Sequence, residues 1–272
     1  MNGLQVFITE HIYITGLVAG LFTWGLTALG ASLIFFFKEV KQVVLDGMLG
    51  FAAGVMIAAS FFSLIIPALD YAEDLNKLNP VLIVVAGVMA GALFLRMLDL
   101  VTPHFHPNQD LVEGTKSKMK RTTLLVMAIT MHNIPEGLAV GVAFGAFAAT
   151  GDPLLLGPAI ALTLGIGIQN FPEGAAVSFP LYREGKTRKQ SFMMGQISGL
   201  VEPIAIIIGI ALVSQMEKIL AFSLAFAAGA MLFVVVEELI PESQAKEEHR
   251  ELVTIFTIIG LCVMLSLDVL LG

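Results

Sequence analysis

The sequence is poor in the charged residues that cover soluble proteins and in the cysteine that cross-links or ligates. Charged side chains make up 14% of its 272 residues, whereas a soluble globular domain carries about 25%. The single cysteine, Cys262, excludes an internal disulfide and a cluster of thiolate metal ligands. The net charge of −7 says little about partners in so apolar a chain, and we expect no nucleic-acid partner.

Apolar residues dominate the composition of the sequence. They form 57% of the chain and give a mean hydropathy of +0.87. Runs of about 20 such residues are long enough to cross a bilayer as helices. The runs do not alternate with period two, so a barrel is disfavoured. We therefore predict an all-α polytopic membrane protein, a single transmembrane domain over residues 1–272. Its eight predicted spans are 11–37, 48–70, 80–101, 122–149, 154–182, 190–213, 218–240 and 251–271.

Basic residues predict the orientation of these spans. The loops after the first, third, fifth and seventh spans hold most of them, and the opposite loops hold only Lys77 and Lys218. The positive-inside rule then places both termini outside and the long loop 102–121 in the cytoplasm. His104 and His106 in that loop are either solvated residues or weak collectors of metal. The basic loop residues are Lys38, Lys41, Lys116, Lys118, Lys120, Arg121, Arg183, Lys186, Arg188, Lys189, Lys246 and Arg250.

A six-residue motif occurs twice. Residues 132–137 read His-Asn-Ile-Pro-Glu-Gly, and residues 169–174 read Gln-Asn-Phe-Pro-Glu-Gly. Each copy lies near the middle of its predicted span, the fourth and the fifth, and these two spans run in opposite directions. Inverted pairs of this kind at the centre of a membrane indicate a transport site.

Helix geometry predicts which motif side chains converge. Residues three and four apart share a helix face, so Glu136 lies between His132 and Asn133. By the same spacing, Glu173 lies between Gln169 and Asn170. Each glutamate is therefore placed to bridge two neighbouring ions.

Prolines and a third carboxylate extend this pattern. Pro135 and Pro172 each remove a backbone donor and predict a kink that frees a carbonyl. Glu202 lies near the centre of the sixth span. A carboxylate at that depth costs about 2.5–3.5 kcal/mol on insertion scales, and no lysine or arginine lies near the depth of these glutamates. Bound cations explain both the carboxylates and the neighbouring imidazole and amides, a mixed N/O set that suits zinc, iron or manganese better than calcium.

These residues resemble the ZIP family of divalent-metal transporters, its bacterial members above all. The matching stretches are H-N-x-P-E-G at 132–137, P-E-G at 172–174 and Glu202-Pro203. The resemblance implies import of zinc, or of iron, manganese, cadmium or cobalt, across the plasma membrane, the inner membrane in bacteria. It also implies a homodimer and an elevator-type movement of spans 1, 4, 5 and 6 against the others.

The resemblance further implies a two-metal centre and no catalytic cofactor. One ion would use His132, Glu136, Gln169 and Glu173, with Met56 nearby. The other would use Asn133, Glu136, Asn170, Glu173 and Glu202. Asn170 stands where some relatives have aspartate, and Glu237-Glu238 where many have His-Glu. An exit-side site at Glu238, Glu237 and His249 is therefore less firmly implied, and packing is the default role for Met56.

Two other functions fit parts of this pattern. An intramembrane metalloenzyme would hold its metal with His132 and Glu136, but the H-E-x-x-H signature is absent. The sequence also offers no nucleophile or acid–base group apart from the metal-ligand set. A metal-selective channel would need no moving block, and the sequence does not separate it from a carrier.

Overall fold

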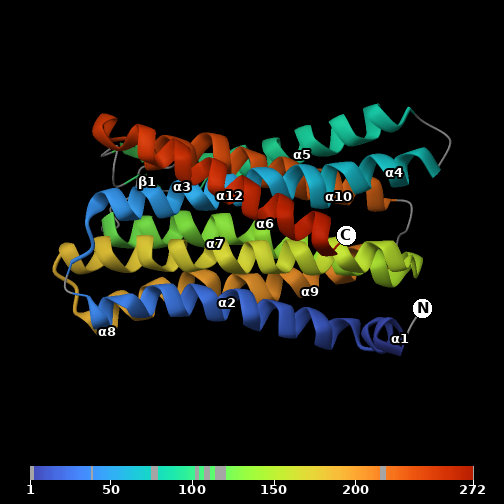
Figure 1. Ribbon diagram of the computed structural model, residues 1–272, viewed down its shortest axis with the longest axis horizontal. Coiled ribbons are helices and arrows are strands. Elements are labelled where there is room, and N and C mark those ends of the chain that lie inside the picture. Colours follow the sequence, from blue (N-terminus) through green and yellow to red (C-terminus); the bar gives the residue numbers. More distant parts are fainter. Residues whose placement is uncertain are drawn as a thin grey trace.

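The computed structural model describes residues 3–37, 39–74, 79–101, 104–106, 111–113, 121–214 and 219–271. Most of these residues lie in helices that run along one common direction, horizontal in Figure 1. The predicted loop 102–121 adds one small exception to the all-α prediction. There, β1 (His104–His106) pairs antiparallel with β2 (Leu111–Glu113). The side chains of His104 and His106 lie outside the described part of the chain.

The helices follow the predicted spans closely. The third predicted span is α5 (Pro80–Val101), while the second begins earlier than predicted, at Gln42. A short helix before the first span, α1 (Gly3–Glu10), was not predicted. The others are α2 (Ile12–Phe36), α3 (Gln42–Ala58), η1 (Ala59–Ile65), α4 (Ile66–Asp74), α6 (Arg121–Thr150), η2 (Pro153–Leu155), α7 (Leu156–Arg183), α8 (Arg188–Gly199), α9 (Val201–Ser214), α10 (Leu220–Val234), η4 (Val235–Leu239), α11 (Ile240–Ser243), η5 (Glu247–His249) and α12 (Arg250–Leu271).

Among the described residues, seven helical segments are long and apolar enough to cross a membrane. The 30-residue α6 is not among these segments, and the side chains of its residues 121–125 lie outside the described part of the chain. Both ends of the chain lie toward the same end of the bundle (Figure 1). The opposite end, here called the basic end, carries Lys41, Arg183 and Arg188. Several basic residues used to predict the orientation lie outside the described residues, namely Lys38, Lys77, Lys116, Lys118, Lys120 and Lys218.

The long helices pack in pairs whose backbones touch. The pairs are α2 with α7, α6 with α9, α5 with α10 and α3 with α12. In the α5–α10 pair, a Cβ on Gly91 would lie 2.0 Å from the carbonyl oxygen of Phe226, and one on Gly229 would lie 2.0 Å from that of Val88. Glycine therefore sets the helix separation from both sides, as the small-residue spacings predict for helices in lipid.

The pairs assemble into two halves (Figure 1). We call α2, α6, α7, α8 and α9 the motif half, because its members pack on one another and carry both motif copies. The partner half comprises α3, η1, α4, α5, α10, η4, α11 and α12. The halves meet chiefly where α3 and α12 contact α7 and where α10 contacts α6.

Prolines affect the two halves differently. In the partner half, the π-helical segments η1 and η4 each end two residues before a proline, Pro67 and Pro241. A proline lacks the N–H and its ring clashes with the carbonyl four residues earlier, so the winding changes there. In the motif half, α6 and α7 continue as α-helices through Pro135 and Pro172. Neither helix is interrupted at these prolines, and the predicted kinks stay a prediction.

The glycine contacts give a direct stability test. Gly229→Ala should lower the unfolding temperature, because its new methyl group meets the Val88 carbonyl and forces α5 and α10 apart. Overpacking of this kind costs about 1–3 kcal/mol. Gly25→Ala in α2 is the matched control, since a Cβ there meets nothing within 4 Å. Thermal unfolding in detergent measures both, and equal shifts for the two variants would contradict the close-packing account.

Candidate metal centre

The two motif copies lie on α6 and α7, which pack against each other inside the motif half. Glu202 reaches the same region from α9, the helix that packs closely on α6. Their side chains face the interior although they are polar. The buried set is His132, Asn133, Glu136, Gln169, Asn170, Glu173 and Glu202. The structure therefore brings together the motif residues that helix spacing predicted to converge.

Three carboxylates share this interior. Glu136 lies within electrostatic range of both Glu173 and Glu202, and Glu173 lies within range of His132. Carboxylates buried together repel one another and lose their hydration, so such a group needs protons or a cation to offset the cost. The arrangement is therefore suited to binding positive charge.

Two asparagines are oriented by their amide nitrogens. Asn170 Nδ2 donates to both carboxylate oxygens of Glu202, each at 2.8 Å, and to the Thr23 carbonyl at 3.3 Å. Asn133 Nδ2 donates to the Ser198 carbonyl at 3.1 Å. Because both nitrogens bond to the surrounding frame, each amide presents its oxygen as an acceptor for a further ligand.

The strongest indication of a ligand is a set of buried polar atoms without partners. Within the described residues, eight buried side-chain atoms meet no hydrogen-bond partner, and seven of them belong to the two motif copies. More than about 90% of buried polar groups in proteins are satisfied, and each one left unmade costs about 1–3 kcal/mol. The seven atoms are Asn133 Oδ1, Glu136 Oε1 and Oε2, Gln169 Oε1 and Nε2, Asn170 Oδ1 and Glu173 Oε2. Six of the seven are oxygens, the donors that a hard or borderline cation prefers.

His132 also contacts the partner half. Its Nε2 lies in hydrogen-bond contact with Oε1 of Glu238, on the π-helical η4. Glu238 is buried, whereas the adjacent Glu237 is exposed. The two glutamates that were predicted to act together at an exit-side site therefore point to different surroundings, and only Glu238 reaches the centre.

Acidic groups continue from Glu238 toward the basic end. Glu242 lies within electrostatic range of Glu238, His132 and Asp46, and it lines a cavity of about 220 Å³ together with Gln42 and other residues of α3 and α7.

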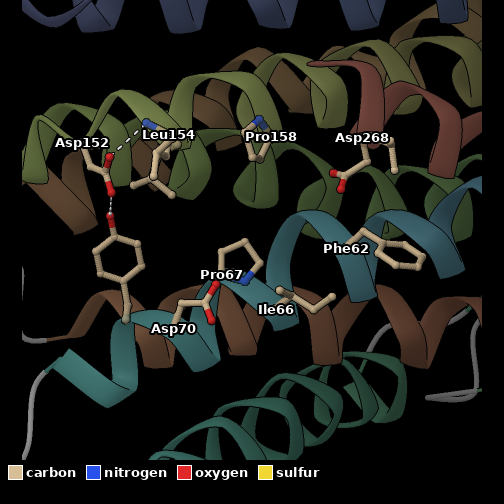
Figure 2. Close-up of a pocket in the computed structure, with 11 residues that line it drawn as sticks. Phe62, Ile66, Pro67, Asp70, Asp152, Leu154, Pro158 and Asp268 are labelled. Carbon is tan, nitrogen blue, oxygen red and sulfur yellow. Dashed lines mark hydrogen bonds between the residues drawn. The ribbon is translucent and has the colours of Figure 1, made fainter. Parts of the chain in front are cut away.

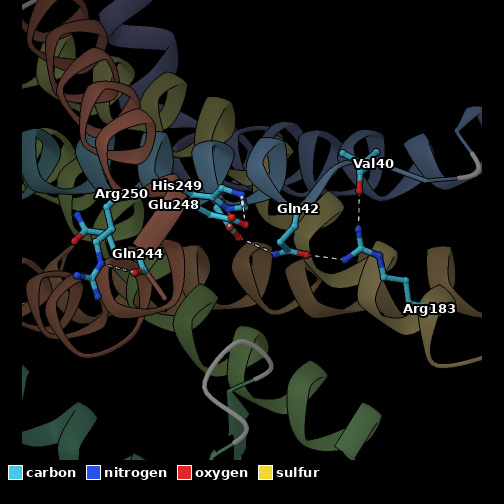
Figure 3. Close-up of polar contacts among 8 residues, drawn as sticks. Val40, Gln42, Arg183, Gln244, Glu248, His249 and Arg250 are labelled. Carbon is cyan, nitrogen blue, oxygen red and sulfur yellow. Dashed lines mark hydrogen bonds and ion pairs between the residues drawn. The ribbon is translucent and has the colours of Figure 1, made fainter. Parts of the chain in front are cut away.

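Asp46 Oδ1 accepts a hydrogen bond of 2.7 Å from Gln42 Nε2, and Asp46 Oδ2 lies 2.6 Å from His249 Nδ1. Both contacts belong to the network of Figure 3. The predicted exit-side residue His249 thus bonds to Asp46. Sequence analysis missed Asp46 and Glu242, although both are acidic residues at the ends of apolar runs.

A second cavity, of about 370 Å³, opens at the other end of the bundle. Asp70 and Asp268 line it, and Tyr71 Oη donates to Asp152 Oδ2 at 3.1 Å across its wall (Figure 2). Asp268 also accepts a hydrogen bond of 2.7 Å from Ser63 Oγ. This acidic cavity is thus lined by residues of both halves.

Met56 occupies a different environment from the motif residues. It is fully buried on α3 in the main apolar cluster, and α3 packs against α7. Its surroundings are those of a packing residue, so its predicted ligand role stays a prediction.

Comparison with known proteins shows the family of the chain. The family model for ZIP zinc transporters matches residues 109–268, which include both motif copies and Glu202. The chain belongs to the ZIP family. It is 39% identical to zinc transporter ZIP11 of Xenopus tropicalis over 94% of this chain and 97% of that protein. It is 37% identical to zinc transporter ZIPB of Bordetella bronchiseptica, over 90% and 78%. It is 36% identical to zinc transporter GufA of Myxococcus xanthus, over 94% and 99%.

Membership of the ZIP family confirms the resemblance found in the sequence. The protein is a multi-pass membrane transporter for metal ions and not an enzyme, so the metalloenzyme alternative falls away.

The unpartnered atoms predict a stabilising effect of metal. Zinc should raise the unfolding temperature of the detergent-solubilised protein, because an ion that binds only the folded state stabilises it by about 2.7 kcal/mol at a hundredfold excess over its Kd. Glu136→Gln should abolish most of this shift, and Glu251→Gln, an exposed change on α12, should keep it. If zinc left the unfolding temperature of the parent protein unchanged, that result would argue against a metal centre at the two motif copies.

Proposed function

We propose that the protein carries divalent transition-metal ions, zinc foremost, across the plasma membrane into the cytoplasm. In a bacterium this membrane is the inner one. The observation that carries the proposal is the group of unpartnered buried oxygens on the two motif copies. The relatives named as zinc transporters support zinc as the first substrate, and the N/O ligand set also suits iron, manganese, cadmium and cobalt.

The centre is proposed to hold two ions bridged by Glu136 and Glu173. Both glutamates are buried between the copies, and three of their four carboxylate oxygens meet no other partner among the described residues. The first ion is assigned to His132, Glu136, Gln169 and Glu173, with Met56 as a weaker candidate. The second is assigned to Asn133, Glu136, Asn170, Glu173 and Glu202. No catalytic cofactor is needed for this function.

The proposed orientation has eight spans in one domain, both termini outside and the basic end in the cytoplasm. Termini at one end of the bundle support an even number of crossings (Figure 1). Lys41, Arg183 and Arg188 at the opposite end fit the positive-inside rule. The exposed apolar faces of α5 and α12 suit lipid or a second copy, in keeping with the homodimer implied by the family resemblance.

Transport is proposed to proceed by movement of the motif half against the partner half. The closest packing lies within each half, and the two motif copies and Glu202 all lie on the motif half, whereas the weaker candidate Met56 lies on α3 of the partner half. A rigid unit that carries its own ligands can move without dismantling the site.

His132 links the centre to the exit. Its imidazole can ligate the first ion or contact Glu238 of the partner half, so we propose that the ion leaves by way of Glu238 toward Asp46 and His249. Glu237, which is exposed, is the weakest member of the exit-side group predicted from the sequence.

Uptake by proteoliposomes tests the transport function. His132→Ala should reduce the initial rate of zinc uptake at least about tenfold, since losing one good ligand costs on the order of 1.4 kcal/mol or more. His11→Ala is the matched control, because His11 lies in the short link between α1 and α2, far from the motif copies in sequence. Saturable, temperature-sensitive uptake supports a carrier, and unsaturable uptake supports a channel. Equal rates for His132→Ala and the parent would refute the assignment.

Metal stoichiometry tests the bridging role. Glu136→Ala should lose both ions, because the carboxylate is shared, whereas Glu202→Gln should lose the second ion only. Asn170→Asp should tighten the second ion, because it adds a charge next to Glu202. Metal content after equilibrium dialysis measures all three. Two ions retained by Glu136→Ala would contradict the bridge.

A further inference from the structure

An apolar groove of about 450 Å³ runs along the boundary between the two halves at the basic end. Its walls come from the end of α2 and from α7 on one side and from the start of α3 on the other. Glu39 is the one charged residue among those that line it. The lining residues are Leu33, Phe37, Glu39, Val40, Val44, Leu45, Met48, Phe171, Ala175 and Phe179.

The groove reaches from the basic end of the bundle to the level of the second motif copy. Its mouth is at Phe37 and Val40, in the link between α2 and α3, and its inner end is at Phe171, the residue after Asn170. A separate buried cluster that includes Ile34 and Leu45 forms the floor. An apolar cleft of this kind accepts hydrocarbon and offers water no hydrogen-bond partners.

Guanidinium groups flank the mouth of the groove. Arg183 Nη2 donates to the Val40 carbonyl and Nη1 to Gln42 Oε1, both at 2.6 Å (Figure 3). Arg188 Nη1 donates to the Phe35 carbonyl at 3.3 Å, and its guanidinium lies 5.8 Å from the Tyr182 ring centre.

These bonds fix both guanidinium groups beside the link between α2 and α3. A guanidinium has five N–H donors, so each arginine keeps donors for an anion. Lys41 in the same link adds a third positive charge. The nearby carboxylates are Glu39, which lines the groove, and Glu184 and Glu242, which line the neighbouring cavity together with Arg183.

We propose that this groove binds one acyl chain of an anionic phospholipid, with the lipid phosphate held at the mouth by Arg183, Arg188 and Lys41. The chain fills the apolar cleft, and the guanidinium groups give the charge-assisted, fork-shaped contacts that phosphate oxygens accept. Basic pockets between membrane helices are recognition sites for anionic headgroups. Neutral phospholipid offers the same chain, but its headgroup adds no net charge for the mouth to attract.

The site lies between helices of both halves, so a bound lipid touches α2 and α7 as well as α3. It does not depend on the identity of the transported ion or on the transport mechanism. Its test is therefore separate from the tests of the metal centre.

Quenching of tryptophan fluorescence by lipids with brominated acyl chains tests the proposal. The sole tryptophan, Trp24, is first replaced by phenylalanine. Phe37→Trp then places a reporter on the groove, and Phe36→Trp places a control reporter beside it. Both parent residues are exposed, 51% and 78%, but Phe36 does not line the groove.

The vesicles contain phosphatidylcholine with a minor fraction of brominated phosphatidylglycerol or brominated phosphatidylcholine. At the Phe37→Trp reporter, the phosphatidylglycerol should quench at least about fivefold more per lipid than the phosphatidylcholine, the factor expected from one basic residue near a membrane surface. At the Phe36→Trp reporter the two lipids should quench about equally.

Neutralising the basic residues at the mouth distinguishes specific headgroup binding from nonspecific contact with bulk lipid. Lys41→Gln combined with Arg183→Gln and Arg188→Gln should make the two brominated lipids equal at the groove reporter. Arg250→Gln is the matched control at the same end, where the parent side chain bonds to the Gln244 carbonyl (Figure 3), and it should keep the preference. Circular dichroism of each variant checks that the helices are intact.

Three results would overturn the proposal. Equal quenching by both brominated lipids at the groove reporter would mean that the reporter contacts only bulk lipid. A preference that survives the neutralised mouth would place the anion elsewhere. A groove reporter that neither lipid quenches would show that protein, such as a second copy of the chain, covers the groove.

Discussion

The burial of three carboxylates inside an apolar bundle is the constraint on which the rest of this molecule depends. Glu136, Glu173 and Glu202 lie buried on α6, α7 and α9. Among the described residues, their polar neighbours are amides and an imidazole, so we propose that protons or a bound cation offset their charge. On this proposal the protein gains stability from its substrate, and the bundle has to keep water and lipid away from the three carboxylates.

Close backbone packing is what makes such an interior possible. At Gly54 and Gly260, a Cβ would lie 1.9 Å from the Thr257 carbonyl oxygen and 2.1 Å from that of Phe51, so α3 and α12 touch without intervening side chains. Similar contacts join α2 to α7 through Gly30 and Gly174. The tightest pairs fall within the halves, which leaves the boundary between the halves to larger side chains, cavities and the apolar groove. Tight pairs therefore determine where the molecule is rigid, and the remaining boundary is where it can change.

The sequence predicted the parts of the site that local geometry governs. The spacing of His132, Asn133 and Glu136 along one helix fixes a shared face, and the duplicated motif predicts the facing set. The contact of His132 with Glu238 spans 106 positions in the chain, and no local pattern encodes it. Asp46 was missed for the same reason, because its partner His249 lies 203 positions away in the chain. At Pro135 and Pro172, α6 and α7 remain continuous helices, whereas the winding changes just before Pro67 and Pro241.

The wide turn of η4 has a consequence for how the chain tolerates length changes. Successive residues of an α-helix are separated by about 100° around its axis, and a π-helical turn accommodates an extra residue within the same rise. Glu238 lies inside this turn and Glu242 just beyond it, in α11. Removing one residue between Val235 and Leu239 would therefore close the wide turn into ordinary α-helix and leave Glu242 on the side on which Asp46 and His132 lie. The wide turn thus lets this helix hold one more residue without changing the direction of the side chains that follow it.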